Sequence, residues 1–177
     1  MKIVKYILII SSSLLLGLFL FGLFLPSEYK IERKIEIEGS LHTISNYITD
    51  LTKWEEWSYM SSKKDSTMKF VYKDSQFGKN SIANWKSEYM GEGILKIYDV
   101  QGNHKIHYEI IIGENDHRIN GTFTLDSLDG KVRLGWIDYG ELGINPIARI
   151  FGMFMEKFIG KDQEESLQHL KKIIEHS

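Results

Sequence analysis

The sequence predicts an α+β protein in which an antiparallel sheet of about seven strands curves around a long C-terminal helix, behind one N-terminal apolar helix. Three observations lead to this prediction. Runs of alternating apolar and polar residues fill the middle of the chain, with turn residues between them. Helical periodicity appears after the first such run and again at the end of the chain. A meander of strands with its helices gathered on one side is an α+β arrangement.

The N-terminal apolar segment runs from Ile3 to Leu25, 23 residues of mostly Ile, Leu, Val and Phe, with Lys5 as its one charge. A helix of this length rises roughly 34 Å, enough to cross about 30 Å of hydrocarbon. It exceeds the roughly 7–15 apolar residues of a signal peptide, and Pro26 stands where a cleavage site would need small residues. We therefore expect residues 1–27 to be a retained single-pass membrane anchor.

The orientation of this anchor depends on the positive charges on either side of it. Lys2, Lys5 and the amino terminus lie at the N-terminal end of the span, and Lys30, Arg33 and Lys34 follow it. The positive-inside count is nearly balanced. Signal-anchor logic favours a cytoplasmic N-terminus with the domain outside the cytoplasm.

Residues 28–177 have the size of one domain with its own core. The 22 basic and 24 acidic residues of the chain are interspersed, without the basic stripe of a nucleic-acid-binding protein. The absence of cysteine excludes disulfides, thiol catalysis and a lipoprotein anchor. Only Pro26 and Ser27 separate the apolar run from the domain, so we expect the domain to lie against the lipid headgroups.

The domain begins with a strand and two short helices. Residues 29–38 alternate apolar and charged side chains, which predicts a strand with one wet face. Ser40 is suited to cap a helix over Leu41–Leu51, whose apolar residues have helical spacing. Trp54 and Trp57 follow on a shorter helical turn and lie on one face of it.

Six more strands follow, separated by turn residues. Their predicted bounds are Met68–Lys73, Ile82–Tyr89, Gly93–Val100, Lys105–Gly113, Arg118–Ser127 and Lys131–Tyr139. The dipeptide Asp129-Gly130 between the last two strands is a strong signal for a tight hairpin.

The segment from Pro146 to His176 is helical, with Pro146 in its first turn. Its apolar residues form two groups roughly 150° apart around the helix axis. The groups are Ile147, Ile150, Phe151, Phe154 and Phe158, and then Leu167, Leu170, Ile173 and Ile174. Gly160 lies between them, so we expect a kink or a break there.

Three stretches carry a family resemblance: Lys30–Ser40, Asp50–Ser58 and Met153–Asp162. Together with the order of elements they resemble the START-like (SRPBCC) helix-grip superfamily, and more narrowly its bacterial membrane-anchored polyketide cyclase/dehydrase proteins. The resemblance implies a deep apolar cavity between the sheet and the terminal helix. It implies no single chemistry, because members include enzymes, carriers and chaperone co-factors.

Aromatic and methionine side chains are the candidates for the wall of such a cavity. Large, adaptable side chains around a curved sheet fit a pocket that accepts several ligand shapes, and ordinary core packing is the alternative reading. The candidates are Trp85, Tyr108, Phe123 and Trp136 on the strands, and Phe151, Phe154, Met155 and Phe158 on the helix.

Two charged residues, Arg33 and Asp138, occupy positions where the strand pattern calls for apolar side chains. A lone buried charge is costly, so each needs a partner or water. The first and last strands of helix-grip proteins are adjacent and antiparallel, so we expect the two residues to pair at the rim of the cavity. A structural pair is favoured over a catalytic one, and no catalytic residue is assigned.

No metal or cofactor is expected. His104 and His107 are three apart in a strand and therefore point to opposite faces, and the other histidines are scattered.

Three functions remain open. The favoured one is a membrane-tethered protein that binds a lipid or another apolar small molecule. A cyclase or dehydratase acting on an apolar polyketide-like substrate would need a proton-transfer group on the cavity wall. A regulatory or chaperone-type partner of a membrane protein would be favoured by an exposed apolar patch on residues 146–159.

Overall fold

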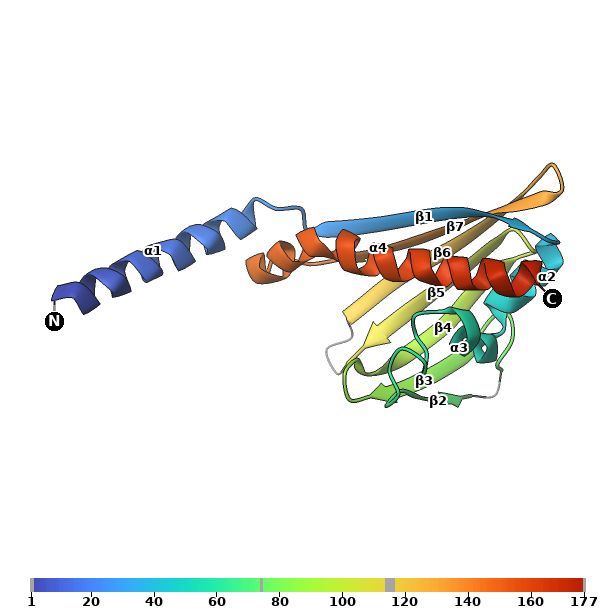
Figure 1. Cartoon of the computed structure of the whole chain (residues 1–177). Helices are drawn as coiled ribbons and strands as arrows, with labels where there is room; N and C mark the ends of the chain where they lie inside the picture. The colour runs from blue at the N-terminus through green and yellow to red at the C-terminus, as the bar shows by residue number, and fades with distance from the viewer. Residues whose placement is uncertain (1, 74, 114–116, 177) are drawn as a thin grey trace.

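The computed structural model describes residues 2–73, 75–113 and 117–176 of the chain (Figure 1). The elements in chain order are α1 (Lys2–Leu23), β1 (Glu28–Glu38), α2 (Leu41–Thr49), the 3₁₀ turn η1 (Leu51–Lys53), α3 (Trp54–Trp57), β2 (Lys69–Tyr72), β3 (Ile82–Ser87), β4 (Gly91–Gln101), β5 (Lys105–Ile112), β6 (His117–Leu128), β7 (Lys131–Glu141) and α4 (Pro146–Glu175). Their ends lie within two residues of the bounds expected from the sequence.

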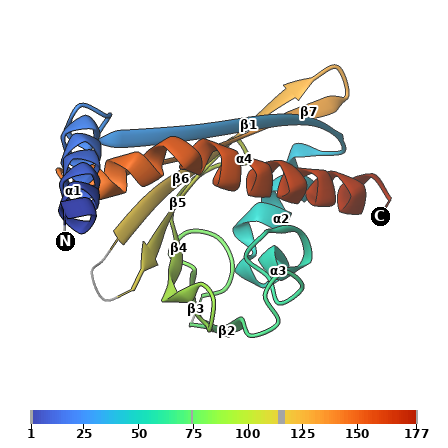
Figure 2. The same ribbon diagram turned by 60° about the vertical axis from the view of Figure 1, so that its left-hand side comes forward.

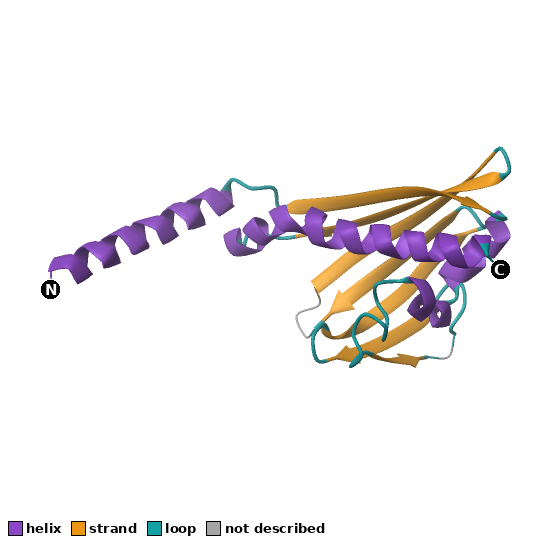
Figure 3. Ribbon diagram, in the orientation of Figure 1, coloured by secondary structure: helices purple, strands orange, loops and turns teal. Residues whose placement is uncertain are grey.

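The seven strands form one antiparallel sheet in the order β1-β7-β6-β5-β4-β3-β2. The predicted hairpin joins β6 to β7, where Leu128 pairs with Lys131 across a two-residue turn. Asp129 and Gly130 both have positive φ, as a primed turn requires. The first and last strands pair along their whole length. The structure therefore confirms the curved α+β arrangement around a long terminal helix (Figure 3).

The core lies between the inner face of the sheet and the helices that cover it. Ile44 and Ile48 of α2, Trp54 and Trp57 of α3, and Leu170 of α4 are all almost completely buried. Figure 1 shows α4 running across the sheet, with α2 and α3 beside its C-terminal half. This half of α4 therefore closes the core.

Helix α1 is long and apolar enough, over Ile3–Leu23, to cross a membrane. It ends two residues before the expected end at Leu25. Phe24 and Leu25 form a tighter turn, in which their backbone N–H groups donate to the carbonyls of Phe21 and Gly22. Pro26 then prevents the helix from continuing, since the residue before a proline avoids helical geometry.

The end of α1 is fixed against the start of α4. A side chain at Gly22 would meet the backbone of Pro146, with a Cβ only 2.6 Å from its carbonyl oxygen. Arg149 Nη1 donates to the carbonyl oxygens of Leu23 and Leu25, at 3.0 and 3.2 Å. A cation at a helix C-terminus satisfies carbonyls that have no partner within the helix and complements its dipole. Helix α1 is therefore held at a defined angle to the domain.

We expected a kink or a break at Gly160, but helix α4 runs without interruption from Pro146 to Glu175, so the helix does not break there. Gly160 has a different role: a Cβ there would lie 2.2 Å from Arg33 Nη2, so the missing side chain makes room for the Arg33 guanidinium. The two apolar faces are nevertheless present. Leu167 and Leu170 are buried, whereas Phe151 and Phe158 are exposed.

Candidate functional site

A row of three residues across the centre of the sheet places a carboxylate inside the domain. Tyr108 on β5 pairs with Gly121 on β6, which pairs with Asp138 on β7. A Cβ at Gly121 would lie 1.9 Å from the Tyr108 ring. The ring therefore lies across the glycine, and its hydroxyl reaches Asp138.

The Asp138 carboxylate is surrounded by neutral donors. Its Oδ1 accepts hydrogen bonds from the Tyr108 hydroxyl and, at 3.1 Å, from Trp136 Nε1. Its Oδ2 accepts one from Gln163 Nε2 on α4, at 2.9 Å. Asp138 is 1% exposed and forms no ion pair with any residue that the structure describes. The Asp138–Gln163 bond thus ties the last strand to the terminal helix inside the core.

Burial controls the protonation of this cluster. Desolvation raises the pKa of Asp138 to about 6, although the bonds from Tyr108, Gln163 and Trp136 oppose the rise. Burial, together with the Asp138 charge, raises the pKa of Tyr108 and of Tyr59, so both hydroxyls keep their protons. The cluster can hold a proton near neutral pH, but both carboxylate oxygens are already occupied and closed off from solvent.

The expected pairing of Arg33 with Asp138 is wrong. Both residues take the inner face, but Ile31 lies opposite Asp138 and Arg33 lies opposite Trp136, two residues further along β1. Arg33 Nη1 instead pairs with Glu156 Oε1 of α4 at 2.8 Å and donates to the carbonyl of Glu32. Because the Glu156 side chain is 58% exposed, this pair contributes only about 0–1 kcal/mol.

The four strand candidates for a cavity wall are buried. Trp54 and Trp57 of α3 fill the space above them: Trp54 packs edge-on against Tyr108 at 5.4 Å between ring centroids, and Trp57 against Trp136 at 5.7 Å. Phe123 and Trp136 are 4.9 Å apart. Three of the strand candidates, Tyr108, Phe123 and Trp136, thus belong to one aromatic cluster that α3 closes.

The fourth strand candidate, Trp85, lies apart from this cluster. A Cβ at Gly93 would lie 2.4 Å from its ring, and Trp85 lines a surface pocket with Gly93 and Ile94.

The helix candidates are not brought together with the strand candidates. Phe151, Phe154 and Phe158 are 68%, 49% and 65% exposed, and Met155 is half-buried. That all eight residues line one apolar cavity stays a prediction.

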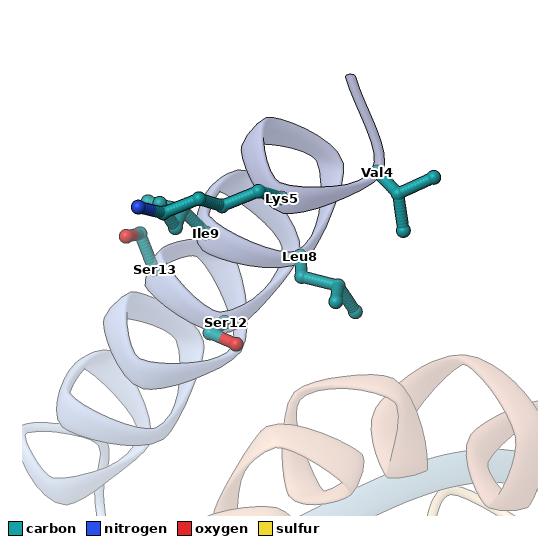
Figure 4. Close-up of a pocket in the computed structure, with 6 residues that line it drawn as sticks. All are labelled: Val4, Lys5, Leu8, Ile9, Ser12 and Ser13. Carbon is teal, nitrogen blue, oxygen red and sulfur yellow. The ribbon is translucent and has the colours of Figure 1, made fainter. Parts of the chain in front are cut away.

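Two other pockets are made by different residues. One is polar and lies between the segment after α3 and the second half of α4, with Tyr59, Lys64 and His169 in its wall. Another lies along α1, where Figure 4 shows the six residues that line it, among them Lys5, Leu8 and Ser13. Since a single helix makes this second pocket, it cannot enclose a ligand by itself.

Three residues of the buried centre, Gln163, Trp54 and Trp57, were not predicted to lie there, although the sequence carries a signal for Gln163. Gln163 shares its helix face with Leu167 and Leu170, so its burial follows from periodicity. Trp54 and Trp57 were recognised as sharing one face, but the pattern does not say that this face fills the centre of the sheet.

The comparisons with known proteins agree with this architecture. Residues 28–175 match the model of a family described as polyketide cyclase / dehydrase and lipid transport. No curated protein sequence matches the chain.

Solved structures share the fold at low sequence identity. Protein CV1439 from Chromobacterium violaceum is 13% identical with a TM-score of 0.56, covering 85% of this chain and 99% of that one. The Aha1 dimer structure from Colwellia psychrerythraea is 13% identical with a TM-score of 0.60, covering 83% and 96%. The di-domain ARO/CYC StfQ from the steffimycin biosynthetic pathway is 11% identical with a TM-score of 0.62, covering 84% and 51%. With the family model matching most of its length, the chain belongs to the polyketide cyclase/dehydrase and lipid transport family of helix-grip proteins.

Proposed function

We propose that this protein is a membrane-tethered binding protein for a lipid or another apolar small molecule, with residues 1–27 as its anchor and residues 28–177 as its binding domain. The observation that carries the proposal is the uncovered apolar surface on the half of α4 that adjoins α1. Phe151, Phe154 and Phe158 are exposed there, and Met155 and Ile159 are half-buried. Apolar surface of this kind commonly marks a site for a ligand, a membrane or a partner.

Met155 and Ile159 are the side chains best placed to contact such a ligand. By helical periodicity they share a side of α4 with Ser166, which accepts a hydrogen bond from the Tyr59 backbone beside α3. That side lies between the core-facing side of α4 and the side that carries the exposed phenylalanines. An apolar molecule that left the bilayer beside α1 would meet these residues first.

Native mass spectrometry of the full chain, released from lipid nanodiscs, tests the proposal. We expect one apolar molecule to remain bound per chain, and Met155→Asp to lose it with an unchanged circular dichroism spectrum. Glu164→Asp, on the exposed second half of α4, is the control and should keep the adduct. A wild-type chain that carries no adduct after extraction from several lipid compositions would contradict the proposal.

A cyclase or dehydratase activity is less well supported. Asp138, with its pKa raised to about 6, could exchange a proton near neutral pH. A substrate would have to displace Tyr108 or Gln163 to reach it, because both carboxylate oxygens already accept hydrogen bonds. This occupancy favours a structural role for the carboxylate.

The exposed apolar surface of α4 also favours a second candidate, a regulatory or chaperone-type partner of another membrane protein. Ile147 and Phe151 are 57% and 68% exposed. They lie within residues 146–159, where an exposed apolar patch was expected to favour this function. Site-specific photo-crosslinking from Phe151 in cells tests it, and a single protein adduct that is lost when the crosslinker stands at Glu164 would support it.

A further inference from the structure

An apolar stripe of four side chains runs along the outer side of the first half of α4. Its members follow one another at spacings of four, three and four, so they lie on one face. They are Ile147, Phe151, Phe154 and Phe158, between 49% and 68% exposed. Phe24 and Ile144, 88% and 87% exposed, lie at the end of the stripe beside α1. We refer to the four side chains on α4 as the outer stripe.

The outer stripe points away from the sheet. The core-facing side of α4 is marked by its buried residues, among them Gln163, Leu167 and Leu170. At 100° per residue, the mean direction of the stripe lies about 160° around the helix from these residues. Nothing in the described part of the domain covers these four side chains completely, so this much apolar surface needs another partner.

The relation of α4 to α1 indicates which partner this is. Figure 2 looks nearly along α1 from its N-terminal end, and in this view α4 runs across the picture in front of the strands. The Arg149 bonds to the end of α1 hold the two helices in this arrangement. If α1 crosses the bilayer, α4 is therefore strongly inclined to the membrane normal, and its side away from the sheet is turned toward the membrane.

The charges around the outer stripe have the pattern of a helix that lies at a membrane surface. Lys157 and Lys161 flank the stripe on one side, where they can reach lipid phosphates. The stripe ends where Asp162 and Glu165 take its place. These two acidic residues lie on the same face of α4 as Phe154 and Phe158, one to three turns further along the helix. Interfacial helices combine an apolar face, buried about 5–10 Å below the headgroups, with lysines beside it.

We propose that the outer stripe of α4 rests on the bilayer, with its phenylalanines inserted at the boundary between headgroups and acyl chains. This inference rests on the membrane anchor in the proposed function and adds a second membrane contact to it. The contact fixes the domain in one orientation, with the sheet on the side of α4 that faces away from the membrane and with Met155 and Ile159 next to the membrane surface.

The natural absence of cysteine allows a direct test in the full chain. Single-cysteine variants carrying the fluorophore NBD are placed in nanodiscs of phosphatidylcholine and phosphatidylglycerol, with nitroxide quenchers on lipids at the headgroup or at the acyl-chain end. Phe154→Cys reports on the outer stripe, and Leu15→Cys reports on the centre of the anchor. Glu165→Cys, three turns after Phe154 on the same face, is the matched control.

We expect the label at Phe154 to shift its emission to shorter wavelength and to be quenched more strongly by the headgroup nitroxide. The label at Glu165 should keep the emission wavelength of a label exposed to water. The label at Leu15 should be quenched more strongly by the nitroxide at the acyl-chain end. Quenching at Leu15 without quenching at Phe154 would overturn the surface contact and leave the anchor standing. Absence of lipid quenching at both positions would overturn the anchor as well.

A blue shift at Phe154 without lipid quenching would also overturn the proposal, because a protein would then cover the stripe. Measuring the label in nanodiscs that hold one chain or two identifies that protein. A shift that appears only with two chains points to a second copy, and a shift at one chain per disc points to a segment of the same chain. Binding of a small ligand is read separately, from the mass adduct of the full chain.

Discussion

At the scale of single residues, Asp138 is an anion in the core without a cation beside it in the described chain. Three neutral donors hold it, and their hydrogen bonds only partly offset the desolvation that raises its pKa to about 6. The cluster nevertheless specifies one arrangement of the core. The three donors meet on one carboxylate only if the Tyr108 ring lies over Gly121 and Gln163 faces the sheet.

The raised pKa sets the sign of a pH dependence. The folded state binds the Asp138 proton more tightly than the unfolded state, whose pKa is near 3.9. The stability from this protonation is complete below about pH 4 and is lost as the pH rises through about 6. A shift of roughly two units corresponds to about 3 kcal/mol, so the wild-type melting temperature should fall from pH 4.5 to 7.

Asp138→Asn should remove this fall of the melting temperature with pH. At pH 7 the variant should melt at a temperature no lower than that of the wild type. The asparagine oxygen can still accept from Tyr108 and Trp136, and the Gln163 Oε1, which has no partner among the described residues, can accept from the new amide. Tryptophan fluorescence melts at several pH values measure both chains. A variant that melts lower at every pH would mean that the three donors stabilise the charge fully. Loss of the mass adduct with unchanged melting would place Asp138 in the ligand site.

The Arg33–Asp138 pairing shows why sequence reasoning stopped short at this scale. Alternation identifies the face that a side chain takes, and both residues are indeed on the inner face. It does not fix the register between two strands, and here an offset of two residues separates the charges. The true partner, Glu156, belongs to a helix whose position depends on packing that periodicity does not encode.

At the scale of elements, α4 has two halves with different tasks. The second half closes the core with Leu167 and Leu170, whereas the first half touches β1 and the end of α1 and leaves its outer side uncovered. The phase change at Gly160 was visible in the sequence. The reason for a glycine at this position was not visible: its missing side chain leaves the space for the Arg33 guanidinium.

Truncations in the two halves should therefore have different costs. Leu170→Ala should lower the free energy of unfolding by about 2–5 kcal/mol, because it leaves a cavity in a completely buried position. Phe154→Ala, at 49% exposure, should change it by only about 0.5 kcal/mol in detergent. Urea titrations of the two variants in the same detergent compare them. Equal losses would mean that the outer side of α4 is covered by the chain itself.

At the scale of the whole molecule, the sequence predicted the N-terminal apolar helix, the strands and the hairpin because each depends on local periodicity or turn chemistry. The contents of the sheet's interior could not be predicted in the same way. Aromatic residues on an inner face are compatible with a ligand or with another part of the chain, and in this protein Trp54 and Trp57 occupy the centre. Apolar surface without a cover is instead found at the end of α4 that lies beside α1.

The side of the membrane on which the domain lies follows from events during insertion, before the domain folds. The salt bridges of Lys30 and Lys34 with Glu32 do not yet exist at that stage, and acidic residues contribute little to orientation. The amino terminus, Lys2 and Lys5 then oppose three cations after the span. Because signal-anchor logic favours that orientation, we predict a cytoplasmic N-terminus and a domain outside the cytoplasm.

A cysteine in place of the exposed Gln168 provides the measurement, since the chain has no other cysteine. A membrane-impermeant maleimide should label the Gln168→Cys variant in intact cells. Because the positive charges are nearly balanced, replacing Lys2 and Lys5 by serine should raise the fraction of chains that are labelled only after permeabilisation. If the Gln168→Cys variant with its natural lysines is not labelled in intact cells, the orientation is opposite to the predicted one. The outer stripe would then rest on the cytoplasmic leaflet, where Lys157 and Lys161 would meet anionic headgroups.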